Sequence, residues 1–210
     1  AAKNLQSFEQ SGALIRDPAP CFYIYRITAG GQSQTGVAVS ASVQAYTENR
    51  IKKHELTRPA KEDDRVRQIE AVNSITGPVF TVHRASAELA TLFGAVTSGV
   101  PDADADGIGG ALHELWVVSE AATVASIGAL LNAMDALYIA DGHHRSAAGG
   151  RIAASRTVAN PYHDGSEAYN GFLAVSFPDD EVTILDYNRV IRDLNGRDAA
   201  GFRNALADQF

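Results

Sequence analysis

The residues of this sequence best suited to chemistry form one short stretch, Asp141-Gly-His-His-Arg145. Histidine gains or loses a proton near neutral pH, and the planar guanidinium of arginine can donate paired hydrogen bonds to a phosphate. The preceding residues, 137–140, are apolar and predict a short buried strand. Small residues after Arg145 lead into a helical pattern. The stretch therefore predicts a strand, a tight turn and the N-terminus of a helix.

A helix N-terminus of this kind can bind an anion, because its free N–H groups and its dipole attract negative charge. Gly142 has no Cβ, so a ligand can approach the backbone closely. A purely structural interpretation is also open. Asp-Gly is a common turn pair, Asp141 can cap the following helix, and adjacent histidines can lie on a surface without a function.

A second group of candidate residues precedes this turn in the chain. Residues 48–67 contain seven of the eighteen Lys and Arg residues of an acidic protein. Pro59 suits the first turn of a helix, which the apolar spacing predicts over residues 59–75. For residues 61–67, a solvated helix face of mixed charge is the simpler interpretation. The stretch before the helix, residues 52–55, is different, because a carboxylate among cations and histidine can act as a general base beside an anionic substrate.

Residues 139–145, Ile-Ala-Asp-Gly-His-His-Arg, resemble the signature of a bacterial family known only as a domain of unknown function. Gly-His-His-Arg resembles, more distantly, the Gly-Cys-His-Arg turn of sulfiredoxin and the Gly-Glu-Arg-Arg turn of ParB, which hold phosphates at a helix N-terminus. The same superfamily includes kinases of free serine. Three other stretches fit the family: Ile51-Lys-Lys-His-Glu-Leu-Thr57, His113-Glu-Leu-Trp116 and Ile184-Leu-Asp-Tyr-Asn-Arg-Val190.

The resemblance implies a small-molecule kinase that transfers a phosphoryl group to the hydroxyl of free L-serine and forms O-phosphoserine. The implied donor is pyrophosphate, ATP or ADP, and the family looks closest to the pyrophosphate-using kinases. The chain has no Gly-x-x-x-x-Gly-Lys-Ser/Thr loop, which excludes a P-loop enzyme. Phosphoryl transfer requires neutralisation of charge, so Mg²⁺ is expected as a cofactor, with Asp141 as its ligand.

The resemblance also implies roles for individual residues. Glu55 corresponds to a glutamate that acts as base in the serine kinases, and His144 and Arg145 are expected to be catalytic with it. The expected substrate- and phosphate-binding residues are Lys52, Lys53, His54, Thr57, Asp141, Gly142, His143, Ser146 and Arg189.

Two other classes of function remain open from the residues. One is a metal-dependent hydrolase that uses His54, His143 and His144, although adjacent histidines on a helix point apart and make poor joint ligands. The other is a ParB-like nonenzymatic switch that binds a nucleotide or partners DNA. A sulfiredoxin-like reductase is not expected, because His143 occupies the position of its essential cysteine.

Composition narrows the choice further. The net charge of −7 argues against stable nucleic-acid binding, which depends on neutralisation of phosphates. A single cysteine, Cys21, allows no intrachain disulfide framework and favours the cytoplasm. No apolar run is long enough to span a membrane, so no membrane partner is expected. The partners expected are the small-molecule substrates.

The chain mixes strands and helices, which predicts an α+β fold with a mixed β-sheet and flanking helices. By resemblance, its core is ParB/sulfiredoxin-like. Residues 1–210 are expected to form a single domain, the core of a longer protein. Gly36 and its small neighbours predict close packing in one strand. The expected strands are residues 21–28, 34–43, 77–83, 112–119, 137–140, 171–177 and 181–185, with a polar hairpin loop at 101–107 and a closing helix at 198–210.

Overall fold

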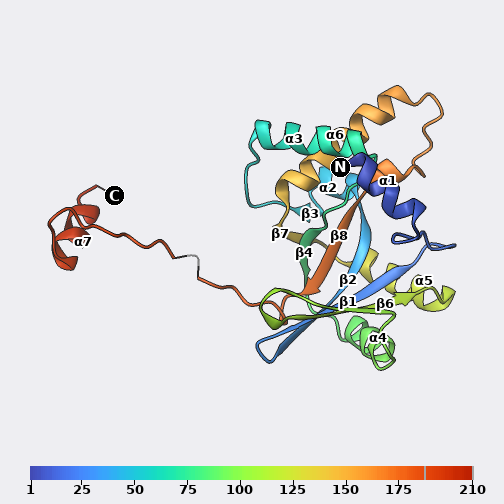
Figure 1. Cartoon of the computed structure of the whole chain (residues 1–210), viewed down its shortest axis with the longest axis horizontal. Coiled ribbons are helices and arrows are strands. Elements are labelled where there is room, and N and C mark those ends of the chain that lie inside the picture. The colour runs from blue at the N-terminus through green and yellow to red at the C-terminus, as the bar shows by residue number, and fades with distance from the viewer. Residues whose placement is uncertain (187, 210) are drawn as a thin grey trace.

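The computed structural model describes residues 1–186 and 188–209 and has an α+β fold, as the sequence predicts (Figure 1). The helices and strands, in chain order, are α1 (Ala2–Gln10), β1 (Phe22–Ala29), β2 (Gln32–Ser42), α2 (Val43–Thr47), β3 (Ile51–Lys52), α3 (Pro59–Val72), β4 (Val79–His83), α4 (Ala87–Thr97), β5 (Ala103–Asp106), β6 (Leu112–Val118), α5 (Ala121–Ala133), β7 (Leu137–Asp141), α6 (His143–Ala159), β8 (Gly171–Pro178) and α7 (Ala199–Ala207).

All the strands belong to one mixed sheet of eight, in the order β3-β7-β4-β8-β2-β1-β6-β5. β3 pairs with β7 in parallel, and β4 pairs with β8 in parallel, whereas the other neighbours are antiparallel. The pairing of β3 with β7 matters most for the position of the residues that follow β3. It aligns Lys52 with Tyr138 and so places residues 52–57 beside the strand that leads into the turn at Asp141.

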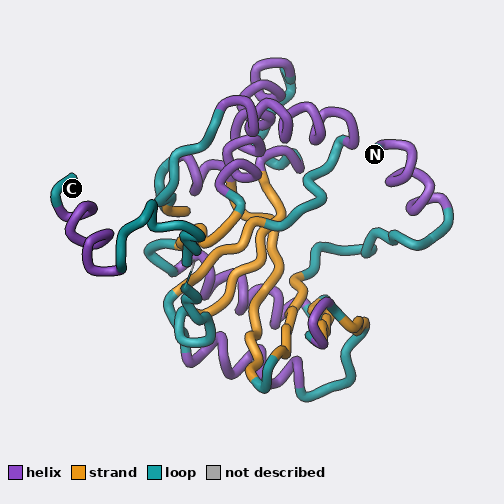
Figure 2. Tube along the Cα trace, turned by 60° about the vertical axis from the view of Figure 1, so that its left-hand side comes forward, coloured by secondary structure: helices purple, strands orange, loops and turns teal. Residues whose placement is uncertain are grey.

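The strands lie between two groups of helices, which Figures 1 and 2 show at opposite ends of the sheet. α3 packs on α6 in the first group, and the core beneath α2 and α6 includes Phe172 of β8 and Ile139 of β7. In the second group, α4 and α5 cover a separate core that includes Ile24 and Trp116. Each group buries the apolar face that a sheet cannot leave in water.

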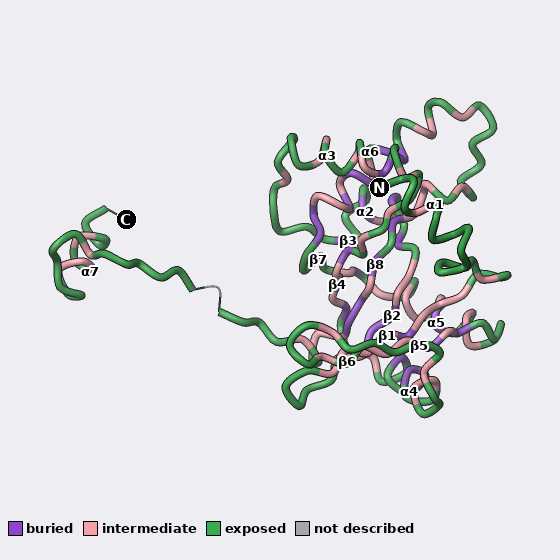
Figure 3. The backbone as a smooth tube through the Cα atoms, in the orientation of Figure 1, coloured by how far each residue is buried: buried purple, intermediate pink, exposed green. Residues whose placement is uncertain are grey.

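Three sequence predictions fail in detail. Residues 103–106, expected in a polar loop, form β5 and pair with the edge of β6. Residues 181–185 form no strand, because the chain leaves the sheet after β8 and runs exposed toward α7 (Figure 3). The sequence also predicts Ser119 as the cap of the helix that follows it, but Glu120 caps α5. Tyr187, within the family-like stretch 184–190, and Phe210, the expected end of the last helix, lie outside the described residues.

Gly36 lies in β2 where the neighbouring strand leaves no room for a side chain, which confirms the close packing predicted there. A Cβ on Gly36 would lie 2.5 Å from the carbonyl oxygen of Ser176 and 2.8 Å from Cδ1 of Phe177. Both atoms belong to β8, which pairs with β2 through the centre of the sheet. The backbone oxygen cannot turn away as the end of a flexible side chain could.

We therefore expect Gly36→Ala to lower the free energy of unfolding by roughly 1–3 kcal/mol, through overpacking. Gly94→Ala is the matched control, since an added Cβ on this α4 glycine meets nothing within 4 Å. It should be neutral or stabilising by up to about 1 kcal/mol, because alanine favours a helix. Urea denaturation measures both, and a Gly36→Ala protein as stable as the wild type would contradict the packing argument.

Candidate active site

The turn between β7 and α6 has the strand–turn–helix form that the sequence predicts. Gly142 joins the two elements with φ +100°, in the left-handed region that glycine adopts without strain. Its carbonyl oxygen accepts hydrogen bonds from the N–H groups of Arg145 and Ser146, at 2.9 and 3.0 Å. α6 has no side-chain cap. Asp141 therefore does not act as the helix cap that the structural interpretation of the turn would require.

The side chain of Arg145 fastens the turn to its surroundings. The guanidinium pairs with the Asp141 carboxylate at 2.5 Å and donates to the carbonyl oxygen of Pro78, in the segment before β4. It also packs beneath Gly142, where a Cβ would lie 3.1 Å from the Arg145 Nε. Two of its donors are thus already engaged, one within the turn and one with the segment before β4, so Arg145 is less free to bind a phosphate than the sequence suggested.

Glu55 and His143 bring the two candidate stretches together. The Glu55 carboxylate lies 3.5 Å from His143 Nδ1, and the ring of His54 packs edge-on against the ring of His143, with centroids 4.5 Å apart. His143 is 4% exposed, and its Nε2 is buried without a hydrogen-bond partner among the described residues. Burial lowers the pKa of His143, with a smaller contribution from the charge of His54. The neutral imidazole is therefore favoured beside the Glu55 carboxylate.

A cavity of about 650 Å³ opens directly in front of this turn. One wall is the turn itself, from Asp141 to Arg145, and another is Glu55. The third is the first half of α3, which contributes Ala60, Lys61, Asp64 and Arg65. His144 lines the cavity too, and its Nε2 accepts a hydrogen bond from the N–H of Arg58 at 3.1 Å. The turn at the start of α6 thus faces open space, with Glu55 within reach of one bound molecule.

The cationic residues of α3 are part of the site that sequence reasoning missed. Lys61 and Arg65 were assigned to a solvated helix face, yet they line the cavity with Asp64. Their spacing carries the signal, because residues four apart lie on the same side of a helix. Asp64 is not a free carboxylate, since a hydrogen bond from Arg65 lowers its pKa. Lys61, by contrast, has no ion-pair partner in the part of the chain that the structure describes.

Several of the expected binding residues lie elsewhere. The ammonium groups of Lys52 and Lys53 lie over the rings of Tyr138 and Tyr46, at 6.0 and 4.3 Å from the ring centres, and neither lysine lines the cavity. The Thr57 hydroxyl donates a hydrogen bond to the carboxylate of Glu62, near the start of α3.

Two further expectations need correction. Ser146 is 0% exposed and donates a hydrogen bond to the carbonyl oxygen of His143 at 3.0 Å. Its hydroxyl is therefore engaged within α6 and does not face a ligand. Arg189 lies on the exposed segment that follows β8 and is not among the residues that line the cavity.

The carboxylates of the cavity suit a Mg²⁺ ion bound together with a phosphate better than a metal ion held by protein ligands alone. In the described part of the chain, no group of three or more His, Cys, Asp or Glu side chains is placed to hold a metal ion together. Asp141 is 76% exposed at the cavity, however. Proteins usually bind Mg²⁺ through one or two carboxylates together with the phosphates of a substrate. The donor set therefore fits a Mg²⁺ ion that arrives with a phosphate compound.

The lowered pKa of His143 gives a pH prediction. An unfolded histidine titrates near 6.5, so below about pH 6.5 the unfolded chain binds more protons than the folded one. The free energy of unfolding should therefore fall as the pH drops from about 7 to 5. Burial lowers the pKa of His83 in the same direction, so part of the decline should survive in His143→Gln.

Urea denaturation across that pH range, together with an NMR titration of the folded protein, measures both effects. The His143 midpoint should lie below 6.5. A midpoint at or above that value, or a decline that is equally steep in His143→Gln, would show that His143 is not buried in neutral form.

Comparison with known proteins identifies the family but no function. Searches of curated proteins and of solved structures find no match. No helix in the described part of the chain is both long and apolar enough to cross a membrane. The family model described as "Protein of unknown function (DUF1015)" matches residues 1–210, the whole of the given sequence. The chain therefore belongs to the DUF1015 family of proteins of unknown function.

Proposed function

We propose that this protein is a small-molecule phosphotransferase whose reaction takes place in the cavity between α3 and the N-terminus of α6. The observation that carries the proposal is the contact of Glu55 with His143 at 3.5 Å, at the start of α6 and beside a cavity lined by both cations and carboxylates. A helix N-terminus favours phosphate, and a carboxylate facing the same space can accept the proton of an attacking hydroxyl. The acceptor is free L-serine, which rests on the resemblance to serine kinases.

The mixed charge of the cavity supports phosphoryl transfer better than the binding of a simple anion. Lys61, Arg65 and Arg145 supply positive charge, whereas Glu55, Asp64 and Asp141 supply negative charge. A simple anion site would gain nothing from three carboxylates. A phosphate compound with its Mg²⁺ needs both signs, because the metal seeks carboxylate oxygens and the phosphates seek cations. When bound, Mg²⁺ would neutralise phosphate charge, and Asp141 is the residue to hold it.

In this proposal each residue of the cavity has a separate role. Glu55 is 60% exposed and takes the proton of the acceptor hydroxyl, while neutral His143 fixes its orientation from below. Lys61 and the N-terminus of α6 hold the donor phosphates, which are those of pyrophosphate, ATP or ADP. Arg145 stabilises charge on the transferred phosphate and keeps Asp141 at the cavity. His144 forms part of the same wall.

The general-base role predicts a specific kinetic effect. Glu55→Gln keeps the size and hydrogen bonding of the side chain but cannot accept the proton, so turnover should fall by roughly 10²–10⁴. Donor binding should hold or tighten, because a negative charge leaves the cavity. O-phosphoserine release measures turnover with each donor in turn, and calorimetry measures donor affinity.

Glu48→Gln is the matched control, since Glu48 is an exposed residue that does not line the cavity. Near-normal turnover in Glu55→Gln would remove Glu55 as the base and make Asp141 the next candidate. Absence of O-phosphoserine with any donor, combined with retained nucleotide binding, would instead favour the nonenzymatic switch.

Arg145 should behave differently from Glu55. Arg145→Ala removes charge that the donor meets already in the ground state and leaves Asp141 without its partner, so donor affinity and turnover should fall together. The loss of an electrostatic stabiliser lowers turnover by about 10²–10³. Arg151→Ala controls for the loss of a cation on the same helix, because Arg151 pairs with Asp63 rather than lining the cavity. Donor affinity unchanged in Arg145→Ala would contradict its place at the phosphates.

A further inference from the structure

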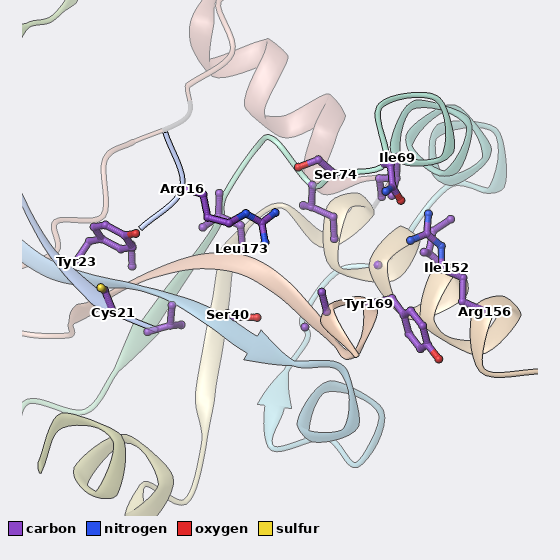
Figure 4. Close-up of a pocket in the computed structure, with 17 residues that line it drawn as sticks. Arg16, Cys21, Tyr23, Ser40, Ile69, Ser74, Ile152, Arg156, Tyr169 and Leu173 are labelled. Carbon is purple, nitrogen blue, oxygen red and sulfur yellow. The ribbon is translucent and has the colours of Figure 1, made fainter. Parts of the chain in front are cut away.

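A second cavity, of about 440 Å³, lies between the sheet, α6 and the segment that precedes β1 (Figure 4). β2 and β8 provide one side, the end of α3 and the loop after it provide another, and α6 closes the third. Its volume falls in the range of small-molecule sites, about 300–1,000 Å³. The two cavities share no lining residue, so this space is separate from the proposed active site.

Two arginines that have no partner among the described residues face this second cavity. Figure 4 shows Arg16, from the segment before β1, and Arg156, from α6, on opposite sides of it. Neither guanidinium forms a hydrogen bond or an ion pair with any residue in the described part of the chain. None of the described residues that line the cavity is Asp or Glu. In a protein of net charge −7, these are cations that the described part of the chain leaves without a neutralising partner.

The rest of the wall combines apolar side chains with the uncharged polar side chains of Ser40, Asn73 and Ser74. Val39, Ile75 and Leu173 contribute aliphatic surface. The two tyrosines use their hydroxyl groups elsewhere: Tyr23 donates to Asp17, and Tyr169 accepts from Asn160 Nδ2 at 3.1 Å. Their rings therefore add apolar surface to the cavity rather than free polar groups.

The two arginines and the apolar surface between them favour one class of ligand. Guanidinium groups bind carboxylates and phosphates through paired hydrogen bonds. An apolar middle between two such groups suits a molecule with an apolar body and negative charge. We propose that the second cavity binds a small organic dianion with an apolar body, either a dicarboxylate or a phosphate monoester.

Calorimetry with two probes tests the proposal and separates the two chemistries. Adipate represents dicarboxylates and phenyl phosphate represents phosphate monoesters, with uncharged adipamide and phenol as their controls. At least one dianion should bind saturably, and its uncharged control should not. Arg16→Gln and Arg156→Gln should each weaken that binding by about tenfold or more, because each removes a charged hydrogen-bonding partner.

Arg203→Gln is the matched control, since Arg203 lies in α7, which extends away from the sheet (Figure 1). Binding should also survive in Glu55→Gln, so a failure of the proposed kinase activity leaves this test intact. Circular dichroism shows whether each variant is folded. The proposal is overturned if neither dianion binds the wild type at about 10 mM, or if Arg203→Gln weakens binding as much as the two cavity variants do.

Discussion

The candidate site depends on one short piece of parallel pairing, that of β3 with β7. β3 is only Ile51–Lys52, yet its register with Leu137 and Tyr138 sets where the following residues, 53–57, enter the site. Hydrogen bonds of Arg50, the residue before β3, hold this pairing in place. The N–H of Leu137 donates to the Arg50 carbonyl oxygen at 2.9 Å, and the Arg50 guanidinium donates to the carbonyl oxygens of Asn132 and Met134 at the end of α5. Without this pairing, Glu55 would have no fixed relation to His143.

The turn at Gly142 is the second constraint, and it is local. Its positive φ allows β7 to end and α6 to begin within one residue, which gives His143 its buried position directly behind the strand. The clamp of Arg145 on Asp141 and on the Pro78 carbonyl then ties the turn to β4, which pairs with β7. A site held by strand ends and a helix start is more rigid than one held on loops alone. One side of the cavity is fixed in this way, whereas Glu55 lies on a connecting segment.

The sequence predicted the parts of this site that depend on local pattern. An apolar run, a glycine and a helical pattern were enough to place the turn at Asp141–Arg145, and proline at residue 59 was enough to start α3. The sequence could not predict which side chains tertiary packing would bury and which it would turn toward the site. Ser146 appeared available because it follows the turn, but the rotation of α6 directs it inward. Lys61 appeared solvated because the sequence does not show which face of α3 lies over the turn.

The predictions for residues 103–106 and 181–185 were wrong for a related reason. Residues 103–106 alternate alanine with aspartate and have little strand propensity, yet the exposed edge of β6 supplies a hydrogen-bonding partner that makes them β5. Residues 181–185 have the apolar pattern of a strand, but β8, which they follow, already pairs with β4 on one side and β2 on the other. Strand formation at both places is decided by the partner that is available, and a single sequence does not record that partner.

The helix that carries the turn is stabilised by packing rather than by its own propensity. Gly149 and Gly150 each cost an α-helix about 1 kcal/mol relative to alanine. At Gly149 a Cβ would meet Phe172 at 3.4 Å, and at Gly150 it would meet the ring of Tyr46 at 3.6 Å. Both distances are ordinary van der Waals contacts, so α6 packs directly against β8 and α2 at these positions. The buried His143 Nε2, which has no hydrogen-bond partner among the described residues, adds a cost of about 1–3 kcal/mol. A helix that carries these costs, one of them at the end that faces the candidate site, depends on its contacts with β8 and α2, so the positioning of His143 depends on the packing of α6.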